Sequence, residues 1–314
     1  MKVIILTKHA VQLPKKKRTK YVFQKVKMCK KCQRYTVLKD ENCPECGTIY
    51  SGVESLARSI FKNRLFSEAI TILTVVCLGI IFAPTVRMLY YSLIAGVLFT
   101  LGYVSLTLIF IKSEYRIQLQ KLLKEDIEKI KAGIQLDSIR AKEDVRADNV
   151  AASYDKLREI CDFIDTDQLK IRSVMALNEI ALRKDMELEL ETLIPSAYDK
   201  GFLKYALEVV KINRSLITKK SIAYFVEHRT EIVRDYGIDS LITVAGSALR
   251  MKLYILEFSD FIQEFIDYFP KDRILRLCNI LHANPEENWG SLAEKTKHLV
   301  RLKYNYDPDF KHFV

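Results

Sequence analysis

A stretch of 43 residues, 69–111, contains a single charged side chain, Arg87. Within it, residues 69–86 and 88–111 form apolar runs that would extend about 27 and 36 Å as helices, at 1.5 Å per residue. These lengths bracket the roughly 30 Å hydrocarbon core of a bilayer, so both runs are predicted to be transmembrane helices. The alternative, a hairpin buried in a globular protein, would require a very large surrounding domain.

The two apolar runs are predicted to form a helical hairpin, because Pro84 ends the first and leaves almost no loop before the second. Basic residues flank the outer ends of the hairpin: Arg58, Lys62 and Arg64 before it, and Lys112 and Arg116 after it. The positive-inside rule therefore places both termini in the cytoplasm, with two spans, and Tyr90 and Tyr91 near the far interface. The apolar run Val3–Leu6 is too short for a signal peptide, which agrees with a cytosolic N-terminus.

Small residues recur every four positions in the second run, at Ser92, Gly96 and Thr100. Such a stripe lets another helix approach closely. We expect it to pack against the first run within the hairpin, and self-association of two chains into a homo-oligomer is the alternative. Ion or proton transport has little support, because the runs contain no acid or base apart from Arg87 at their edge.

The formal net charge of +11 belongs to the N-terminal part of the chain. Residues 1–66 contain 16 Lys and Arg against 4 Asp and Glu, whereas the remainder contains 34 against 35. This imbalance favours an anionic partner for the N-terminal part.

Two CxxC pairs, Cys29–Cys32 and Cys43–Cys46, are separated by ten residues. Two residues between thiolates allow one tight turn to direct both sulfurs at one ion, and two such turns complete a tetrahedral shell of four sulfurs. The spacing therefore predicts a structural Zn²⁺ site with no open position for catalysis. The other cysteines, Cys77, Cys161 and Cys278, are scattered, so no disulfide framework is predicted and the soluble parts are expected in a reducing compartment.

The second pair, Cys43-Pro44-Glu45-Cys46-Gly47, resembles the CPxCG pattern of the zinc-ribbon family over about residues 21–51. The resemblance implies a small β-rich fold with short strands at Tyr21–Met28, Tyr35–Leu38 and Thr48–Tyr50. Zinc ribbons bind nucleic acids, dock proteins or only stabilise structure, so the motif does not decide the function. A segment this short cannot bury enough apolar surface to fold without its metal.

Basic residues precede and surround the cysteine pairs, and aromatic residues interleave them at Tyr21, Phe23 and Tyr35. The candidates for anion or phosphate binding are Lys15, Lys16, Lys17, Arg18, Lys20, Lys25, Lys27, Lys30, Lys31 and Arg34. One interpretation is binding to a nucleic-acid backbone. A second is attraction to anionic lipid headgroups of the membrane. A third is a solvated tail that acts only as the positive-inside signal.

Amphipathic helical patterns fill the chain after the hairpin. Residues 113–135 carry an apolar stripe, residues 137–150 are highly charged, and from about Ala151 helices alternate with tight turns. The predicted helices there include Asp167–Leu182, Glu187–Tyr198 and Phe202–Ile212. Pairs of such helices resemble HEAT-like repeats, which implies an α-solenoid with a concave surface for a partner, against the alternative of an irregular bundle.

No catalytic constellation emerges from the C-terminal region, so an enzyme is not expected. His228, His282, His298 and His312 are isolated, and Glu187, Glu189 and Glu191 do not fall on one helix face. Cys161 and Cys278 are expected to be small core residues, and Trp289 either a packing anchor or an exposed contact for a partner.

The predicted protein is therefore mainly α-helical, with a small β-rich zinc ribbon, a transmembrane hairpin and a solenoid-like C-terminal domain. Its expected parts are a basic arm (1–20), the ribbon (21–51), a juxtamembrane linker (52–68), the hairpin (69–111), a charged helical connector (112–150) and a cytoplasmic helical domain (151–314).

Two functions are compatible with this organisation. The first is a membrane-anchored adaptor or scaffold that binds a protein partner through the helical domain, with the basic ribbon as a second contact surface. The second is a membrane-tethered protein that binds nucleic acid through the arm and ribbon. An enzyme is a distant third.

Overall fold

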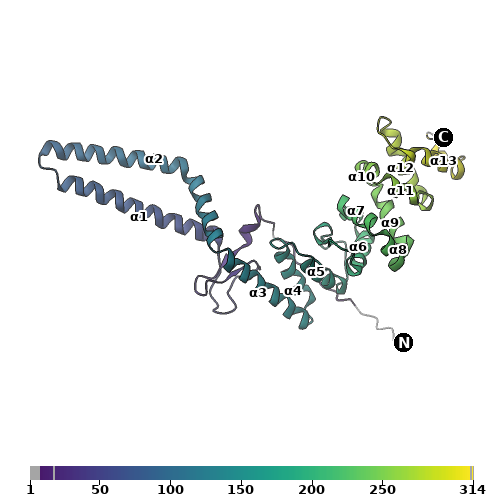
Figure 1. The fold of residues 1–314 in the computed structure, drawn as a ribbon, viewed down its shortest axis with the longest axis horizontal. Helices are drawn as coiled ribbons and strands as arrows, with labels where there is room; N and C mark the ends of the chain where they lie inside the picture. Colours follow the sequence, from purple (N-terminus) through teal and green to yellow (C-terminus); the bar gives the residue numbers. More distant parts are fainter. Residues whose placement is uncertain (1–7, 17, 312, 314) are drawn as a thin grey trace. The chain divides into compact units, whose positions relative to one another are not determined.

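The computed structural model describes residues 8–16, 18–311 and 313, which form two compact units (Figure 1). The helical unit combines residues 8–16 with the chain from Glu143 onward, and the ribbon–hairpin unit extends from residue 18 to Lys142. The predictions made for Val3–Leu6, Lys17 and His312 lie outside the described residues.

Two long antiparallel helices form the hairpin, α1 (Val53–Ile81) and α2 (Val86–Glu125). The first helix ends five residues before the predicted boundary at Val86. Pro84 has no backbone N–H to donate, so it cannot continue the helix and lies in a short turn. Thr85 caps α2, since its Oγ1 accepts a hydrogen bond from the Met88 backbone N–H at 3.4 Å. At the other end, the predicted linker 52–68 is the helical start of α1.

Both hairpin helices are long and apolar enough to cross a membrane, and almost none of their apolar windows is buried inside the protein. They pack on each other through small residues: a Cβ added to Gly96 would lie 3.0 Å from Val76 Cγ1, and one added to Gly79 would lie 2.7 Å from Ser92 Oγ. Ser92 and Gly96 therefore face α1 within the hairpin, whereas Thr100 is exposed.

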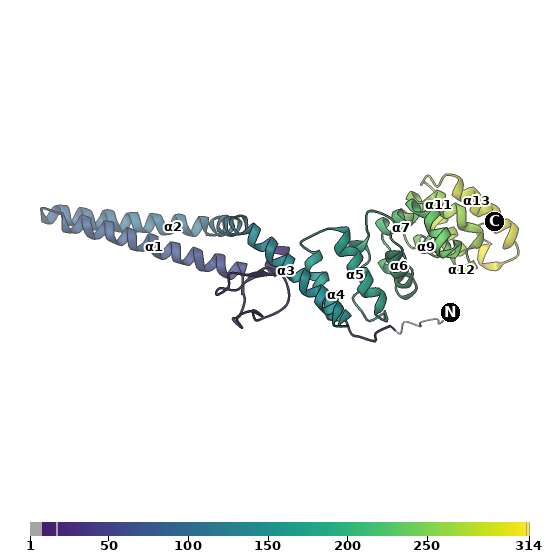
Figure 2. The same ribbon diagram turned by 60° about the horizontal axis from the view of Figure 1, so that its bottom comes forward.

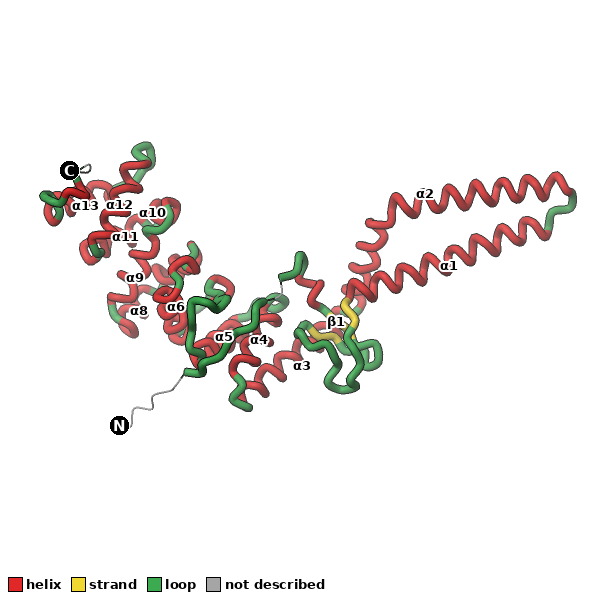
Figure 3. The backbone as a smooth tube through the Cα atoms, turned by 180° about the vertical axis from the view of Figure 1, so that it is seen from behind, coloured by secondary structure: helices red, strands yellow, loops and turns green. Residues whose placement is uncertain are grey.

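The ribbon is a three-stranded antiparallel sheet with the strand order β2-β1-β3 (Figure 3). Its strands are two residues long: β1 (Lys27–Met28), β2 (Tyr35–Thr36) and β3 (Ser51–Gly52). Lys27 pairs with Thr36 on one side and with Gly52 on the other.

Two of the predicted strands differ from the structure. Half of the predicted strand Tyr21–Met28 is a 3₁₀ turn, Val22–Lys25, in which the Gln24 side chain accepts a hydrogen bond from the Tyr21 backbone N–H at 3.1 Å. The third strand begins after Tyr50 and leads directly into α1, so the predicted strand Thr48–Tyr50 is displaced.

Helix α3 (Ile127–Arg146) follows α2 and starts in the ribbon–hairpin unit. Ile130 and Ile134, which belong to the apolar stripe predicted over residues 113–135, are buried. Asp137 is buried on the same helix, so the charged stretch 137–150 is not exposed along its whole length, and periodicity missed this residue because it is an aspartate.

The helical unit is built from short helices that succeed one another in chain order (Figure 2). These are α4 (Val150–Cys161), α5 (Asp167–Glu179), α6 (Lys200–Ile212), α7 (Lys219–Glu227), α8 (Arg229–Tyr236), α9 (Ile238–Ala248), α10 (Lys252–Glu257), α11 (Ser259–Phe265), α12 (Lys271–Ala283) and α13 (Ser291–Lys303). Three 3₁₀ turns lie between these helices, at Glu191–Leu193, Arg214–Leu216 and Ile266–Tyr268, and a fourth, Pro308–Phe310, follows α13. A continuous apolar core runs through the unit from Leu13 to Phe310.

The segment predicted as the helix Glu187–Tyr198 is extended apart from one 3₁₀ turn. Leu188 and Leu190 are buried, whereas Glu187 and Glu189, which alternate with them, contact Lys16. A period of two residues is typical of extended chain, and this alternation outweighs the helix propensities of Leu and Glu. The helix prediction was wrong here.

Residues 8–16 are built into the helical unit and are not a separate basic arm. His9 forms a parallel bridge with Ile180, in which its backbone N–H donates to Glu179 O at 2.8 Å and its carbonyl accepts from Ala181 N at 2.9 Å. Leu13 is buried in the apolar core with only 7% of its surface exposed. The described N-terminal segment is therefore an integral part of this unit.

Lys16 ends this segment in a cluster of acids. Its Nζ lies 2.8 Å from Asp162 Oδ1 and 2.9 Å from Glu189 Oε1, and its backbone N–H donates to Glu187 at 3.0 Å. Burial acts to lower the pKa of Lys16, but the two carboxylates outweigh burial and raise it. Lys16 is therefore an internal ion-pair partner.

We expect Leu13→Ala to destabilise the helical unit by about 2–3 kcal/mol, because it removes a buried side chain and leaves a cavity. Urea unfolding followed by the fluorescence of Trp289, the one tryptophan of the chain, measures the change in this unit. Leu302→Ala is the matched control, since Leu302 is 73% exposed and should change the stability little. Equal effects of the two variants would contradict a structural role for residues 8–16.

Candidate metal centre

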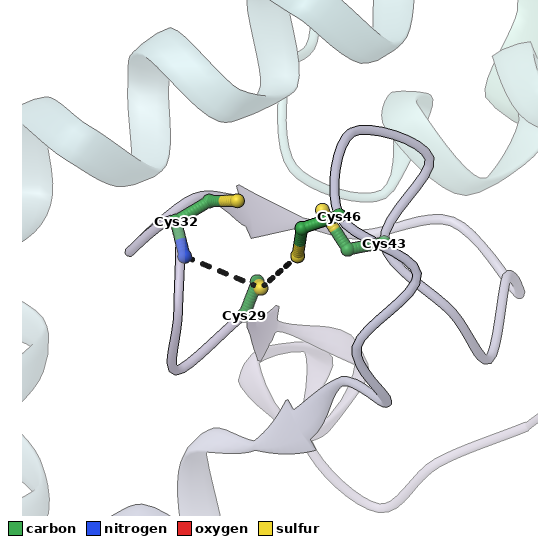
Figure 4. A group of neighbouring side chains, drawn as sticks. All are labelled: Cys29, Cys32, Cys43 and Cys46. Carbon is green, nitrogen blue, oxygen red and sulfur yellow. Dashed lines mark hydrogen bonds between the residues drawn. The ribbon is translucent and has the colours of Figure 1, made fainter.

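The four cysteines of the two CxxC pairs converge in the ribbon (Figure 4). Their sulfur atoms all lie within 4.8 Å of one another, with Cys29 and Cys43 buried and Cys32 exposed. A tetrahedral ion with metal–sulfur bonds of about 2.3 Å would require sulfurs roughly 3.8 Å apart, which is within this range. The cluster can therefore hold a metal ion.

The two pairs sit in equivalent turns. Gln33 N donates to Cys29 O and Gly47 N donates to Cys43 O, each at 2.8 Å. The residues that close the turns both have positive φ angles, 55° at Gln33 and 70° at Gly47. Glycine adopts this conformation without strain, so Gly47 was a readable signal in the sequence, whereas Gln33 gave none.

Polar groups around the cluster act differently on its thiols and join the two turns. Hydrogen bonding to Thr48, whose hydroxyl lies 3.3 Å from Cys46 Sγ, lowers the pKa of Cys46 to about 6, whereas the hydrogen bond with Cys46 raises the pKa of Cys32 to about 12. The Cys32 backbone N–H donates to Cys29 Sγ at 3.4 Å. Arg34, beside the first pair, makes an ion pair with Glu45, which lies inside the second.

Helix α3 supports the ribbon from one side. The Asp137 carboxylate accepts hydrogen bonds from Thr36 Oγ1 at 2.8 Å and from Val37 N at 3.0 Å. Burial raises the pKa of Asp137. Gly133 allows the close approach, because a Cβ there would lie 2.3 Å from Tyr35 O.

The donor set suits a structural metal ion better than a catalytic one. Four sulfur ligands complete a tetrahedral shell, and no position remains for water or a substrate. The ribbon around them has strands of two residues, which cannot close such a turn-rich fold alone. A bound ion would therefore contribute directly to the folding of this segment.

The structure separates the predicted anion-binding residues into two groups. Exposed side chains belong to Lys15, Arg18, Lys20, Lys30 and Lys31. The others are engaged or covered: Lys16 in its acidic cluster, Lys25 with 9% of its surface exposed, Lys27 bonded to the carbonyls of Lys39 and Asp40, and Arg34 paired with Glu45.

The described residues outside the ribbon contain no second group of three or more His, Cys, Asp and Glu side chains placed to hold a metal ion. Cys278 is buried in the apolar core, and Cys161 is partly buried beside Ser173. Trp289 is 6% exposed and its indole N–H donates to Asn284 O at 2.9 Å, which makes it a packing residue.

Comparison of the chain with protein-family models, curated proteins and solved structures gives no match. The function is therefore inferred from the geometry of this chain.

We expect the purified protein to contain one metal ion per chain, and Cys29→Ser or Cys43→Ser to lose it, because a tetrahedral site of four sulfurs loses much of its affinity with one thiolate removed. Elemental analysis by mass spectrometry measures the content. Cys77→Ser is the control, since Cys77 is exposed on α1 and far from the cluster in sequence. Unchanged metal content in both ribbon variants would refute the site.

Proposed function

We propose that the protein is a membrane-anchored scaffold, in which the helical unit binds a protein partner and a structural Zn²⁺ stabilises the ribbon beside the membrane hairpin. The observation that carries this proposal is the division of the chain: residues 8–16 and the chain from Glu143 onward form one unit, and the ribbon and hairpin are inserted between them. The hairpin is then an anchor inserted into one folded domain: the chain leaves the helical unit before the ribbon and re-enters it after the hairpin.

This division also supports one orientation in the membrane. A hairpin of two spans returns the chain to the side where it began, and the described chain before and after the ribbon–hairpin unit belongs to the helical unit. The basic residues Arg58, Lys62 and Arg116 flank the hairpin, whereas its turn carries only Arg87. By the positive-inside rule, we place the helical unit and both termini in the cytoplasm.

Zinc is the ion that best matches the cluster. Tetrahedral sites of four thiolates are typical of zinc, and cytoplasmic proteins keep such thiols reduced. The ribbon contacts both helical neighbours: Val53, the first residue of α1, donates its N–H to Val26 O at 3.1 Å, and α3 holds strand β2 through Asp137. We propose that the ribbon fixes the helix that enters the membrane relative to the helix that follows the hairpin.

The helical unit has the features of a partner-binding domain. Its helices follow one another in chain order, which is compatible with a solenoid-like arrangement. A cavity of about 610 Å³ lies between α12 and α13, lined by apolar side chains that include Leu281, Trp289 and Val300, with Lys297 among them. A cavity of this size and lining can accept an apolar anchor residue of a partner.

Nucleic-acid binding is the second candidate. Tyr21 is 50% exposed and stacks on Phe23, and Lys20 lies over the Tyr21 ring. Lys30 and Lys31, inside the first cysteine turn, are also exposed. An exposed aromatic ring together with exposed basic side chains is the kind of surface that binds single-stranded nucleic acid.

The orientation is testable with sealed inside-out and right-side-out membrane vesicles. We expect a membrane-impermeant protease to degrade the helical unit only where the cytoplasmic face is outward, because two spans put both flanks on that side. Fragments are identified by antibodies against the N-terminal and C-terminal ends. Protection of one end and cleavage of the other would contradict the hairpin, and release of the protein by alkaline carbonate would contradict insertion.

The partner is testable by crosslinking in native membranes followed by mass spectrometry. We expect Ala293→Phe, which fills the cavity between α12 and α13, to reduce recovery of the principal protein partner at least about tenfold, as loss of a buried anchor contact does. Leu302→Ala on the exposed face of α13 is the control, and an unchanged helical circular-dichroism spectrum shows that the variant is folded.

Nuclease treatment of a parallel sample separates the two candidate functions. Protein partners that survive nuclease support the scaffold. Partners that disappear with nuclease, together with recovered nucleic acid that is lost when Lys30 and Lys31 are changed to Glu, would assign the function to the ribbon.

A further inference from the structure

The uncharged part of α1 next to the turn is shorter than a bilayer is thick, although α1 as a whole is long enough to cross one. From the turn, α1 has thirteen residues before its first acid, Ala69–Ile81, and these extend about 20 Å at 1.5 Å per residue. The hydrocarbon core of a typical bilayer is roughly 30 Å thick. Glu68 is therefore nearer to the far side of the membrane than a full span would place it.

The turn itself cannot lie in hydrocarbon. Residues 82–85 are not helical, and exposed backbone groups require water. Arg87, Tyr90 and Tyr91 are exposed next to the turn, and Arg and Tyr side chains are favoured at an interface. With the turn at the far interface, Glu68 lies below the near surface of the membrane or draws the lipid headgroups down to it by thinning the bilayer.

A network of charged and polar groups occupies this level of the hairpin. Arg64 Nε lies 2.8 Å from Glu68 Oε1, and Arg64 also pairs with Glu114 on α2. The Tyr103 hydroxyl on α2 donates to Glu68. One guanidinium is shared by two carboxylates, so the carboxylates retain negative charge that a cation beside them would offset near hydrocarbon.

A cavity of about 230 Å³ lies against the network, between α1 and α2. One part of its wall is Arg64, Glu68, Tyr103 and Glu114, and the rest is mainly apolar: Phe61, Leu65, Leu106, Thr107, Phe110 and Ile111. The wall is therefore amphipathic in the way that a phospholipid is amphipathic.

We propose that this cavity binds the headgroup of an aminophospholipid such as phosphatidylethanolamine, and this inference rests on the proposed insertion of the hairpin. The primary ammonium lies between Glu68 and Glu114 and donates hydrogen bonds to both carboxylates. Arg64, whose guanidinium has more N–H donors than its two carboxylate contacts use, faces the phosphate. Leu65, Leu106 and Phe110 contact the acyl chains.

The selectivity of the cavity depends on the charge of the headgroup and on the number of N–H groups that the headgroup can donate. A choline headgroup has the same charge but no N–H to donate to the carboxylates, so it binds more weakly. An anionic glycerol headgroup supplies no cation and is repelled by the network. The structure therefore orders the three headgroups as ethanolamine, choline and glycerol.

The test uses the full-length protein in nanodiscs that contain phosphatidylethanolamine, phosphatidylcholine and phosphatidylglycerol in equal parts. Lipids that remain bound after transfer to mild detergent are counted by native mass spectrometry. We expect ethanolamine lipid to exceed choline lipid about fivefold to tenfold, as one or two charge-assisted hydrogen bonds to a partly desolvated carboxylate imply. Equal retention of the two, or enrichment of the glycerol lipid, would overturn the proposal.

Matched variants locate the site. Glu68→Gln and Glu114→Gln should each abolish the enrichment, whereas Glu125→Gln, on an exposed part of α2 outside the cavity, should preserve it. Metal content and Trp289 fluorescence show that each variant is folded. A protein that fails to enter nanodiscs refutes the membrane anchor, whereas one that enters without preference refutes only the lipid site.

Discussion

The convergence of four cysteine sulfurs is the constraint on which the ribbon–hairpin unit depends. The strands of the ribbon are two residues long, and its core around the cysteines contains little besides Tyr50. A metal ion bound by the cysteines would supply the free energy that such a small core lacks. Because strand β3 continues into α1 and strand β2 is bonded to α3, such an ion would also help to fix how these two helices meet.

The position of the hairpin within the chain determines how the helical unit is assembled from two separate segments. A membrane anchor at the end of a protein leaves its domain attached by one connection, whereas an inserted hairpin has two. Residues 8–16 contribute a bridge at His9, the buried Leu13 and the ion pairs of Lys16 to the helical unit. Both connections therefore lead into packed structure, and the helical unit needs both flanks of the insertion to complete its core.

Spacing rules predicted those features that depend on local periodicity. The CxxC pairs and the uncharged stretch 69–111 identified the sulfur cluster and the two long apolar helices, because the distances between these residues follow from turns and helices alone. Long-range contacts could not be predicted. Nothing near Lys16 in sequence indicates that it pairs with Asp162 and Glu189, so it was assigned to an anion-binding arm. The alternation of Glu and Leu over Glu187–Glu191 was visible in the sequence, but the high helix propensity of both residue types favoured the wrong prediction.

Asp137 illustrates why the support of the metal site was also missed. Its sequence neighbours are charged, and a charged stretch favours an exposed helix or linker. In the fold this carboxylate is fully buried, bonded to Thr36 and Val37, with Arg140 Nη1 3.9 Å away. Burial raises its pKa, so the environment opposes the charge that its hydrogen bonds require. An apolar residue would avoid this cost but would leave a backbone N–H and a hydroxyl unpaired in the interface. The aspartate therefore contributes specificity, since only one register of strand β2 on α3 satisfies both donors.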